Sequence, residues 1–295
     1  MRIKRGKEQT IFNLVSYTTV IIFTLLCVIP FLLVISGSFT DEGSIHTDGY
    51  RFIPKQFSLN AYRVAFAMPG NIIRAYGVTG TVTVAGTLLG LFIICMTAYA
   101  LQRPQFKYRN GFALYFYFTT LFSGGLVPWY ILMVRYLHLK NNYLALLFPA
   151  MLTVFDIIIM RSFMKSIPEA LAESAKIDGA GEFRIFAQIF LPLSKPALAT
   201  VGLFIALRYW NDWYASMLFI TDKKMFSLQF YLYSMLTQME YAANDAKSAG
   251  ILMDQYPAES FKLAMTIVAT GPILLLYPFV QKYFIQGMTV GAVKG

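Results

Sequence analysis

Six long apolar stretches limit what this chain can fold into more than any other feature of its sequence. They lie at 12–36, 78–101, 112–134, 143–160, 197–220 and 262–281. A helix crosses a bilayer core of about 30 Å with about 20 apolar residues, and each stretch is close to that length. Only 14% of the residues are charged, against roughly 25% in soluble domains. Because backbone polar groups in lipid must bond within their own segment, we expect an all-α integral membrane protein with six transmembrane helices.

The positions of lysine and arginine predict the orientation of these helices. Basic residues gather before the first stretch, between the second and third, in the polar segment 161–196, and after the last stretch. With six spans these places fall on one side, which the positive-inside rule makes cytoplasmic. We therefore expect a multi-pass protein of a bacterial cytoplasmic membrane with both termini in the cytoplasm. The net charge of +10 fits basic ends that face anionic lipid, and we expect no nucleic-acid binding.

The segment between the fourth and fifth stretches is too polar to cross a membrane. Gly179 and Gly181 divide it into two short amphipathic helices, and Pro192 and Pro196 are expected to end the second. Such a compact polar projection is suited to a groove on a partner protein.

This segment resembles the EAA loop of binding-protein-dependent ABC importer permeases. Glu173-Ser174-Ala175 is followed after three residues by Gly179, and after nine more by Ile189-Phe190-Leu191-Pro192. Every position fits the loop except Ser174, where the family usually has alanine. The resemblance implies a type I importer permease fold of the MetI-like kind. It would cover 1–295 as a single permease domain, with a cytoplasmic coupling loop at about 161–196.

Further segments resemble the carbohydrate branch of that family. The stretches 123–130, 210–213, 277–295 and 51–62 are similar to the MalG-like permeases, and within them to the LplC/YtcP group. The resemblance therefore runs over nearly the whole chain. It implies import of oligosaccharides, with acidic or complex polysaccharide fragments among the candidates.

The family likeness also implies the partners of the chain. These are a second homologous permease subunit, two copies of a cytoplasmic ATP-binding subunit, an extracytoplasmic solute-binding protein and membrane lipid. Segments 41–62 and 221–256 would contact the solute-binding protein. The chain has no G-x-x-x-x-G-K-[ST] phosphate loop, so we expect that it binds no cofactor and is no enzyme. ATP and Mg²⁺ would be used by the partner ATPase.

The resemblance assigns the coupling role to residues 169–186, which would dock in a cleft of the ATPase. The candidate contacts are Glu169, Glu173, Ala175, Asp178, Gly179, Ala180 and Phe183. Glu173 would be the acidic contact, Gly179 the hinge, and the two alanines the close-packing positions. The alternative is an amphipathic turn that only stabilises the fold.

Polar residues inside the fourth and fifth stretches are candidates for the transport path. They are Asp156, Arg208, Trp210, Asn211, Asp212 and Trp213. Ionisable groups in a bilayer face protein or a water-filled cavity, and aromatic rings beside amide and carboxylate groups suit sugars. Arg208 and Asp212 stand four residues apart and could pair on one helix face, with Asp156 as another candidate partner. These residues either line the path or hold helices together. An unpaired Arg208 would favour an acidic oligosaccharide.

Gly124, Gly125 and Pro128 predict a break in the third stretch, which serves as a hinge or as a close helix crossing. We expect no metal site, since the two histidines are far apart and both cysteines lie within spans. The competing function is an ion-coupled secondary transporter, which would need a proton relay within the spans. Only Asp156 and Asp212 qualify for such a relay.

Overall fold

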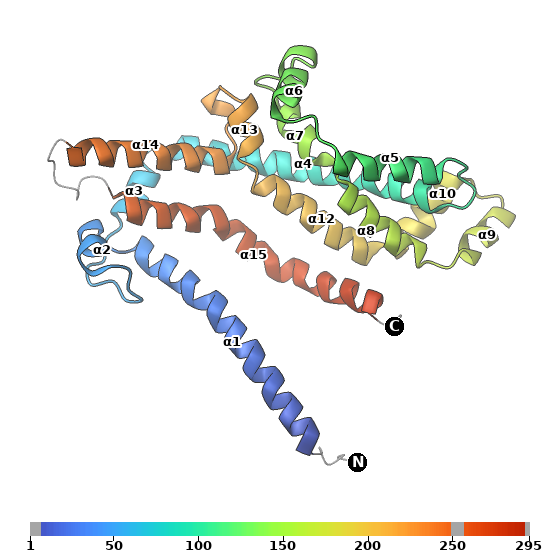
Figure 1. Cartoon of the computed structure of the whole chain (residues 1–295), viewed down its shortest axis with the longest axis horizontal. Coiled ribbons are helices and arrows are strands. Elements are labelled where there is room, and N and C mark those ends of the chain that lie inside the picture. Colours follow the sequence, from blue (N-terminus) through green and yellow to red (C-terminus); the bar gives the residue numbers. More distant parts are fainter. Residues whose placement is uncertain (1–6, 249–256, 293–295) are drawn as a thin grey trace. The chain divides into compact units, whose positions relative to one another are not determined.

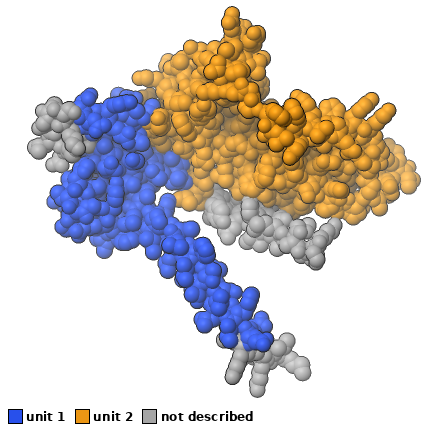
Figure 2. Space-filling view, in the orientation of Figure 1, with its two compact units in different colours: residues 1–68, 234–271 blue, residues 69–233, 272–295 orange. Residues whose placement is uncertain are grey.

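A computed structural model describes residues 7–248 and 257–292, which are mostly helical (Figure 1). Within these residues the only β-structure is an isolated bridge between Thr40 and Phe57, so the expected all-α fold is confirmed. The chain divides into two compact units, residues 1–68 with 234–271 and residues 69–233 with 272–295 (Figure 2). The expectation of a single permease domain stays a prediction.

The first unit contains the N-terminal span and the segments that follow it. Helix α1 (Lys7–Ser38) exposes nearly all its large apolar side chains between residues 11 and 32, as a helix facing lipid does. The short helices α2 (Glu42–Asp48) and α3 (Asn60–Ala65) follow. Buried Glu42 accepts hydrogen bonds from the backbone N–H groups of Glu259 and Ser260, both at 2.9 Å. This carboxylate therefore caps the start of α15 (Ala258–Ala292), where a negative charge favours the helix dipole.

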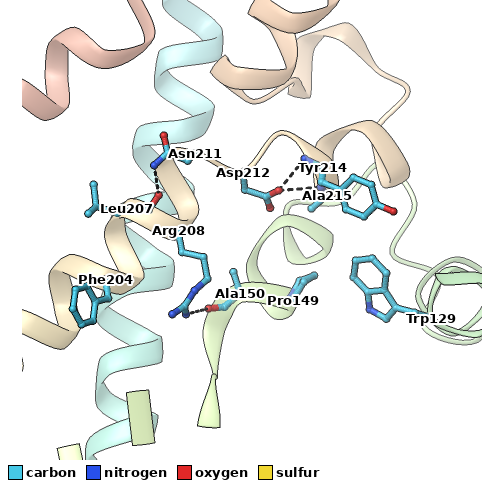
Figure 3. Close-up of a pocket in the computed structure, with 10 residues that line it drawn as sticks. All are labelled: Trp129, Pro149, Ala150, Phe204, Leu207, Arg208, Asn211, Asp212, Tyr214 and Ala215. Carbon is cyan, nitrogen blue, oxygen red and sulfur yellow. Dashed lines mark hydrogen bonds between the residues drawn. The ribbon is translucent and has the colours of Figure 1, made fainter. Parts of the chain in front are cut away.

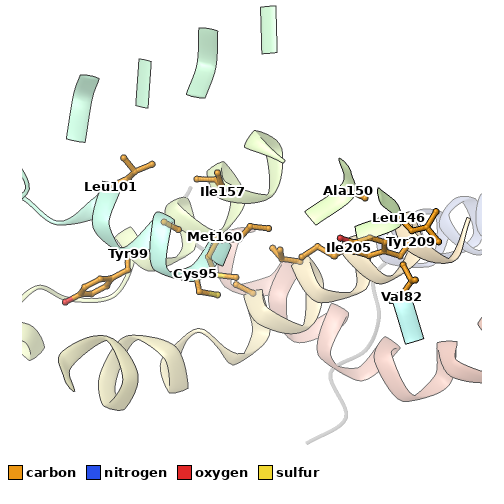
Figure 4. Packing of buried hydrophobic residues seen from close by; sticks show 14 of the residues in the cluster. Val82, Cys95, Tyr99, Leu101, Leu146, Ala150, Ile157, Met160, Ile205 and Tyr209 are labelled. Carbon is orange, nitrogen blue, oxygen red and sulfur yellow. The ribbon is translucent and has the colours of Figure 1, made fainter. Parts of the chain in front are cut away.

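The second unit is built around α4 (Pro69–Gln102), which packs against α7 (Tyr143–Met151), α8 (Val154–Lys165) and α12 (Lys195–Trp210). Figure 4 shows buried side chains that these helices contribute to one hydrophobic cluster. Two glycines of α4 permit the close approach. A Cβ on Gly86 would collide with the Tyr209 ring, and one on Gly90 would lie 2.5 Å from the Met151 carbonyl oxygen. Small residues allow helix backbones to approach in this way.

Several of the predicted spans are bent. In the described part of the chain three helices are long and apolar enough to cross a membrane, and up to six spans result if each bent pair counts as one. The break expected in the third span is present. Helix α5 (Arg109–Leu121) meets α6 (Leu126–Ile131) and the π-helix η1 (Leu132–Tyr136) at 113°. Gly125 there has φ +85°, which glycine adopts without strain.

The fourth predicted span, 143–160, is bent. Helix α7 ends at Met151, and α8 starts at Val154 with a 50° change of direction. The Thr153 hydroxyl accepts the Asp156 N–H at 3.3 Å and caps α8. A threonine with extended backbone at this position starts a new helix instead of continuing the old one.

Candidate coupling loop and transport pocket

The polar segment folds as two short helices, as predicted. Helix α9 (Ala170–Ile177) and helix α10 (Glu182–Ile185) are separated by a turn in which Gly179 has φ +82°. Helix α10 continues through the π-helix η2 (Phe186–Phe190) and α11 (Leu191–Leu193), and this segment ends between Pro192 and Pro196, as expected. The chain then bends by 82° into α12. Each proline lies in the first turn of a helical segment, where its missing N–H costs little.

Four charged residues join the end of α4 to both helices of the loop. The Arg103 side chain is 4% exposed, and its Nη1 lies 2.7 Å from Glu169 Oε1 while its Nε lies 3.3 Å from Glu182 Oε2. Lys176 Nζ lies 2.7 Å from Glu182 Oε1. We call Arg103, Glu169, Lys176 and Glu182 the loop ion cluster. It holds the loop against the end of α4.

The chemistry around Glu182, which lies outside the spans, keeps it ionised. Burial acts to raise the pKa of its carboxyl group, but hydrogen bonds from Lys176 and Tyr99 and the charge of Arg103 outweigh burial. Together they lower the pKa from 4.5 to about 2. The Tyr99 hydroxyl donates to Glu182 Oε2 at 2.6 Å. The Glu182 carboxylate is therefore charged at neutral pH.

Sequence reasoning missed the roles of Arg103 and Glu182. Arg103 counted only toward the orientation of the spans, and Glu182 was not singled out. An acidic residue directly after Gly181, at the start of a helix, was the available signal for the second. Nothing local marks Arg103, because its two carboxylate partners lie 66 and 79 residues further along the chain.

The remaining loop residues divide between an inner and an outer face. Ala172 is buried, and Ala175 and Ala180 pack half-buried against the core. Glu173, Asp178 and Gly179 are exposed. Phe183 is 66% exposed and Ile177, which the sequence analysis did not select, is 87% exposed. Large apolar side chains held in water beside charged ones are typical of a surface that binds another protein.

A pocket of about 550 Å³ lies among the broken spans of the second unit. Its lining residues, shown in Figure 3, are Trp129, Pro149, Ala150, Phe204, Leu207, Arg208, Asn211, Asp212, Tyr214 and Ala215. Arg208 Nη1 donates to the Ala150 carbonyl at 3.1 Å. Its Nη2 lies 2.8 Å from Asp156 Oδ2 and 3.4 Å from Thr153 Oγ1. One side chain of α12 therefore bridges the break between α7 and α8.

Of the two candidate partners of Arg208, Asp212 does not pair with it. Helix α12 ends at Trp210, so Asp212 lies beyond it and does not follow the i,i+4 spacing of a helix. Its Oδ1 accepts the N–H groups of Tyr214 and Ala215 at 2.9 and 3.1 Å (Figure 3). These bonds hold the start of α13 (Tyr214–Phe219). Asp156, the other candidate partner, is the residue that pairs with Arg208.

The two tryptophans after Arg208 are not among the residues that line the pocket. The Trp210 ring lies 6.3 Å from the Tyr76 ring, and the Trp213 ring lies 5.0 Å from the Tyr233 ring, both measured between centroids. Trp129, which sequence reasoning did not select, lines the pocket instead. Its position directly after Pro128, in the helix that follows the glycine break, was the available signal.

The pocket combines aromatic, amide and carboxylate groups in an apolar surrounding. The Asp156 side chain is 0% exposed and that of Arg208 is 31% exposed. Because the two neutralise each other, the condition of an unpaired Arg208, on which an acidic substrate was inferred, is not met. Among the described residues no group of three or more His, Cys, Asp or Glu side chains could hold a metal ion.

Comparison with known proteins identifies the class. Residues 90–290 match the family of binding-protein-dependent transport system inner membrane components, and the chain belongs to that family. It is 38% identical to the polygalacturonan/rhamnogalacturonan transport system permease protein YtcP of Bacillus subtilis (strain 168), covering 98% of this chain and 100% of the relative. It is 39% identical to protein LplC of the same organism, covering 91% and 90%.

A solved structure shows the same fold. That structure is of a bacterial ABC transporter involved in the import of the acidic polysaccharide alginate. The TM-score is 0.77 at 30% identity, and the match covers 95% of this chain and 98% of the other. The resemblance to carbohydrate importer permeases is therefore confirmed.

The family makes this chain a multi-pass membrane permease subunit of an ABC importer. In such an importer ATP is hydrolysed by partner subunits. The family implies partners such as a second permease, an ATPase and a binding protein. The comparisons give no support to an ion-coupled secondary transporter.

Proposed function

We propose that this permease subunit carries oligosaccharides, including fragments of complex polysaccharides, through the pocket around Arg208. The observation that carries the proposal is that pocket, in which ring faces and polar groups meet among broken transmembrane helices. Aromatic rings stack on the apolar faces of sugars, and amide and carboxylate groups bind their hydroxyls. The saccharides in the names of YtcP and of the alginate importer support the same substrate class.

The substrate contacts proposed from this chain are Arg208, Asn211, Asp212 and Trp129. Asp156 acts through Arg208, and Trp210 and Trp213 support the path by packing. Because Arg208 is already neutralised by Asp156, this pocket provides no free cation for a uronate. We expect it to bind hydroxyl groups of acidic and neutral oligosaccharides alike.

The proposed setting is a bacterial cytoplasmic membrane, with both termini of the chain in the cytoplasm. A second homologous permease completes the path, and two copies of an ATP-binding subunit use ATP and Mg²⁺. An extracytoplasmic solute-binding protein delivers the sugar, and lipid surrounds the spans. Segments 41–62 and 221–256 are the proposed contacts of the binding protein, although residues 249–256 lie outside the described part of the chain. The chain itself binds no cofactor and no nucleic acid.

The coupling role falls to the outer face of α9 and α10. Glu173, Ile177 and Phe183 would contact the ATPase, with Asp178 and Gly179 shaping the turn between the helices. Glu169, Ala175 and Ala180 would serve on the inner side, where Glu169 pairs with Arg103. Movement of the loop would therefore reach α4 directly.

The glycine break of the third span is the proposed hinge. Gly124, Gly125 and Pro128 lie where the chain turns by 113° just before Trp129 of the pocket wall. A change in the backbone angles of Gly125 would move Trp129 relative to Arg208. The glycine break would thereby take part in opening and closing the transport path.

The test is uptake of labelled neutral and uronate-rich oligosaccharides into proteoliposomes that hold the whole importer, with and without internal ATP. We expect ATP-dependent uptake that requires the binding protein. Gly179→Pro should abolish it, because proline cannot adopt φ +82° and removes the N–H that Gly179 donates to Lys176.

Gly181→Pro is the matched control, since φ at Gly181 is −73° and suits proline. Retained uptake in this control with loss in Gly179→Pro would support the coupling role. Equal uptake by Gly179→Pro and wild type would overturn it. Uptake driven by an ion gradient without ATP would overturn the proposed function itself.

A further inference from the structure

A second pocket, of about 660 Å³, lies where three helices of the second unit end or begin. It is lined by Gln102, Pro104, Arg109, Asn110, Arg161, Lys165, Ser166, Ile167, Pro168 and Glu169. It shares no lining residue with the pocket around Arg208. Helix α4 ends at Gln102, α5 begins at Arg109 and α8 ends at Lys165. The pocket therefore lies at the ends of the second, third and fourth spans.

Positive charge dominates this pocket. Arg109, Arg161 and Lys165 line it, and in the described part of the chain none of the three forms a salt bridge. Glu169 is the acidic residue of the wall, and its carboxylate is already paired with Arg103 at 2.7 Å. The three cations therefore line one pocket, and none of them has an acidic partner there.

The two arginines are also half-buried, so their charges are partly removed from water. Charges that are close together and partly desolvated repel one another more strongly than in free solution. The first turn of α5 adds to the positive potential, because no side chain caps its N–H groups. A bound anion would relieve this repulsion.

An apolar groove lies on the neighbouring face of the same turn of α5. It encloses about 370 Å³ and is lined by Tyr108, Gly111, Phe112 and Tyr115. A Cβ on Gly111 would meet nothing within 4 Å, so the groove is open at that point. The residues of the groove lie three or four apart and form one stripe along the helix. A polar cationic pocket beside an apolar stripe matches a molecule with an anionic head and an apolar tail.

We propose that this pocket binds the headgroup of an anionic phospholipid, with an acyl chain lying along the Tyr108–Tyr115 groove. Basic pockets between transmembrane helices on the cytoplasmic side bind such headgroups, and the basic residues of this chain predict that side for the pocket. Free inorganic phosphate shares the charge but leaves the apolar groove unused. The proposal goes beyond sugar transport and concerns what holds the base of the coupling loop, since Ile167, Pro168 and Glu169 form part of the wall.

The experiment measures lipid retained by the whole importer complex. The complex is assembled in nanodiscs of mixed phosphatidylcholine and phosphatidylglycerol, extracted into detergent, and its bound lipids are counted by native mass spectrometry. Wild type should retain phosphatidylglycerol in preference to phosphatidylcholine. Arg161→Gln with Lys165→Gln should lower that preference by about tenfold or more, because each cation near an anionic headgroup contributes to binding.

Matched variants distinguish the pocket from general surface charge. Arg184→Gln with Lys195→Gln removes the same net charge from exposed positions that line neither the pocket nor the groove, and should retain phosphatidylglycerol as wild type does. The charge-conserving pair Arg161→Lys with Lys165→Arg should also retain it, which separates loss of binding from loss of folding. An equal loss in the exposed pair and the pocket pair would overturn the proposal.

Two further outcomes would also overturn it. Displacement of the lipid by millimolar inorganic phosphate would show that the site takes a free anion. Loss of the ATPase from complexes of the Arg161→Gln, Lys165→Gln variant, with lipid retention unchanged, would assign these cations to a protein interface. Neither outcome bears on sugar uptake by wild type, so this proposal can fail while the transport function stands.

Discussion

The loop ion cluster and the Arg208–Asp156 pair bury charges of opposite sign. In the cluster the cation is buried, with Arg103 4% exposed, while its partners Glu169 and Glu182 are 34% and 49% exposed. In the pocket the anion is buried, with Asp156 0% exposed, while Arg208 is 31% exposed. The cluster has two carboxylates for one buried arginine, whereas the pocket has one arginine for one buried carboxylate. The pocket pair therefore depends on a single partner and the cluster does not.

The glycines near the two regions differ in how closely other atoms pack against them. Gly86 and Gly90 lie in close contact with Tyr209 and Met151, which adjoin Arg208 and the break of the fourth span. Gly179 and Gly181 in the loop have open space where a Cβ would be. Packing thus fixes the pocket, while backbone conformation and charge fix the loop.

The largest effect is expected from Arg208→Gln. It leaves the buried Asp156 carboxylate without a counter-charge, which should lower the free energy of unfolding by about 3–5 kcal/mol. Asp156→Asn leaves a partly exposed arginine that still reaches the Ala150 carbonyl, and should cost about 1–2 kcal/mol. Unfolding of the detergent-solubilised chain by a denaturing detergent measures both losses in the free energy of unfolding.

The double variant Arg208→Gln with Asp156→Asn is the control for that asymmetry. It should be more stable than Arg208→Gln alone, because no buried charge remains. Equal losses in the two single variants would show that burial of the anion does not set the cost.

Gly90→Ala tests the close packing beside the pocket. Its methyl group would lie 2.5 Å from the backbone oxygen of Met151, which cannot rotate away as a side chain can. We expect a loss of about 1–3 kcal/mol, measured by the same unfolding assay. Gly77→Ala in the same helix, where nothing lies within 4 Å, should be neutral or slightly stabilising. A neutral Gly90→Ala would contradict the close approach of α4 and α7.

Removing carboxylates from the loop ion cluster should show a threshold. Glu169→Gln or Glu182→Gln alone leaves Arg103 with one carboxylate, and each should cost less than about 1 kcal/mol. The double variant leaves a buried arginine without any carboxylate partner and should cost about 1–3 kcal/mol. Hydrogen exchange of the backbone amides of α9 would measure this loss of stability within the loop. Strictly additive losses would argue that the two carboxylates act independently.

The smallest effect concerns pH. The pKa of Glu182 is lowered to about 2 from 4.5, so its contribution to stability is fully present above about 4.5 and is lost as the pH falls toward about 2. Exchange protection of the loop should thus decline with acidification in wild type. In Glu182→Gln this part of the decline should be absent. The same pH profile in both proteins would mean that Glu182 does not hold the loop.

Local sequence determined the elements of this protein. Apolar runs long enough for a bilayer predicted the spans, and the two glycines of the polar segment predicted α9, α10 and the turn at Gly179. Gly124 and Gly125 likewise predicted the break of the third span. These predictions succeeded because helix formation and glycine conformation depend on neighbouring residues. The bend in the fourth span was not predicted, because Thr153 acts as a cap only where the backbone is already extended.

Tertiary structure alone decided which charges meet. Sequence spacing favoured Asp212 as the partner of Arg208, but α12 ends before Asp212 and the arginine pairs with Asp156, 52 residues earlier. Arg103 and Glu169 are 66 residues apart and meet because α4 ends beside the start of the loop. Spacing along the chain carries pairing information only within one helix. Between helices, pairing depends on how closely the backbones pack, and here Gly86 and Gly90 allow that approach.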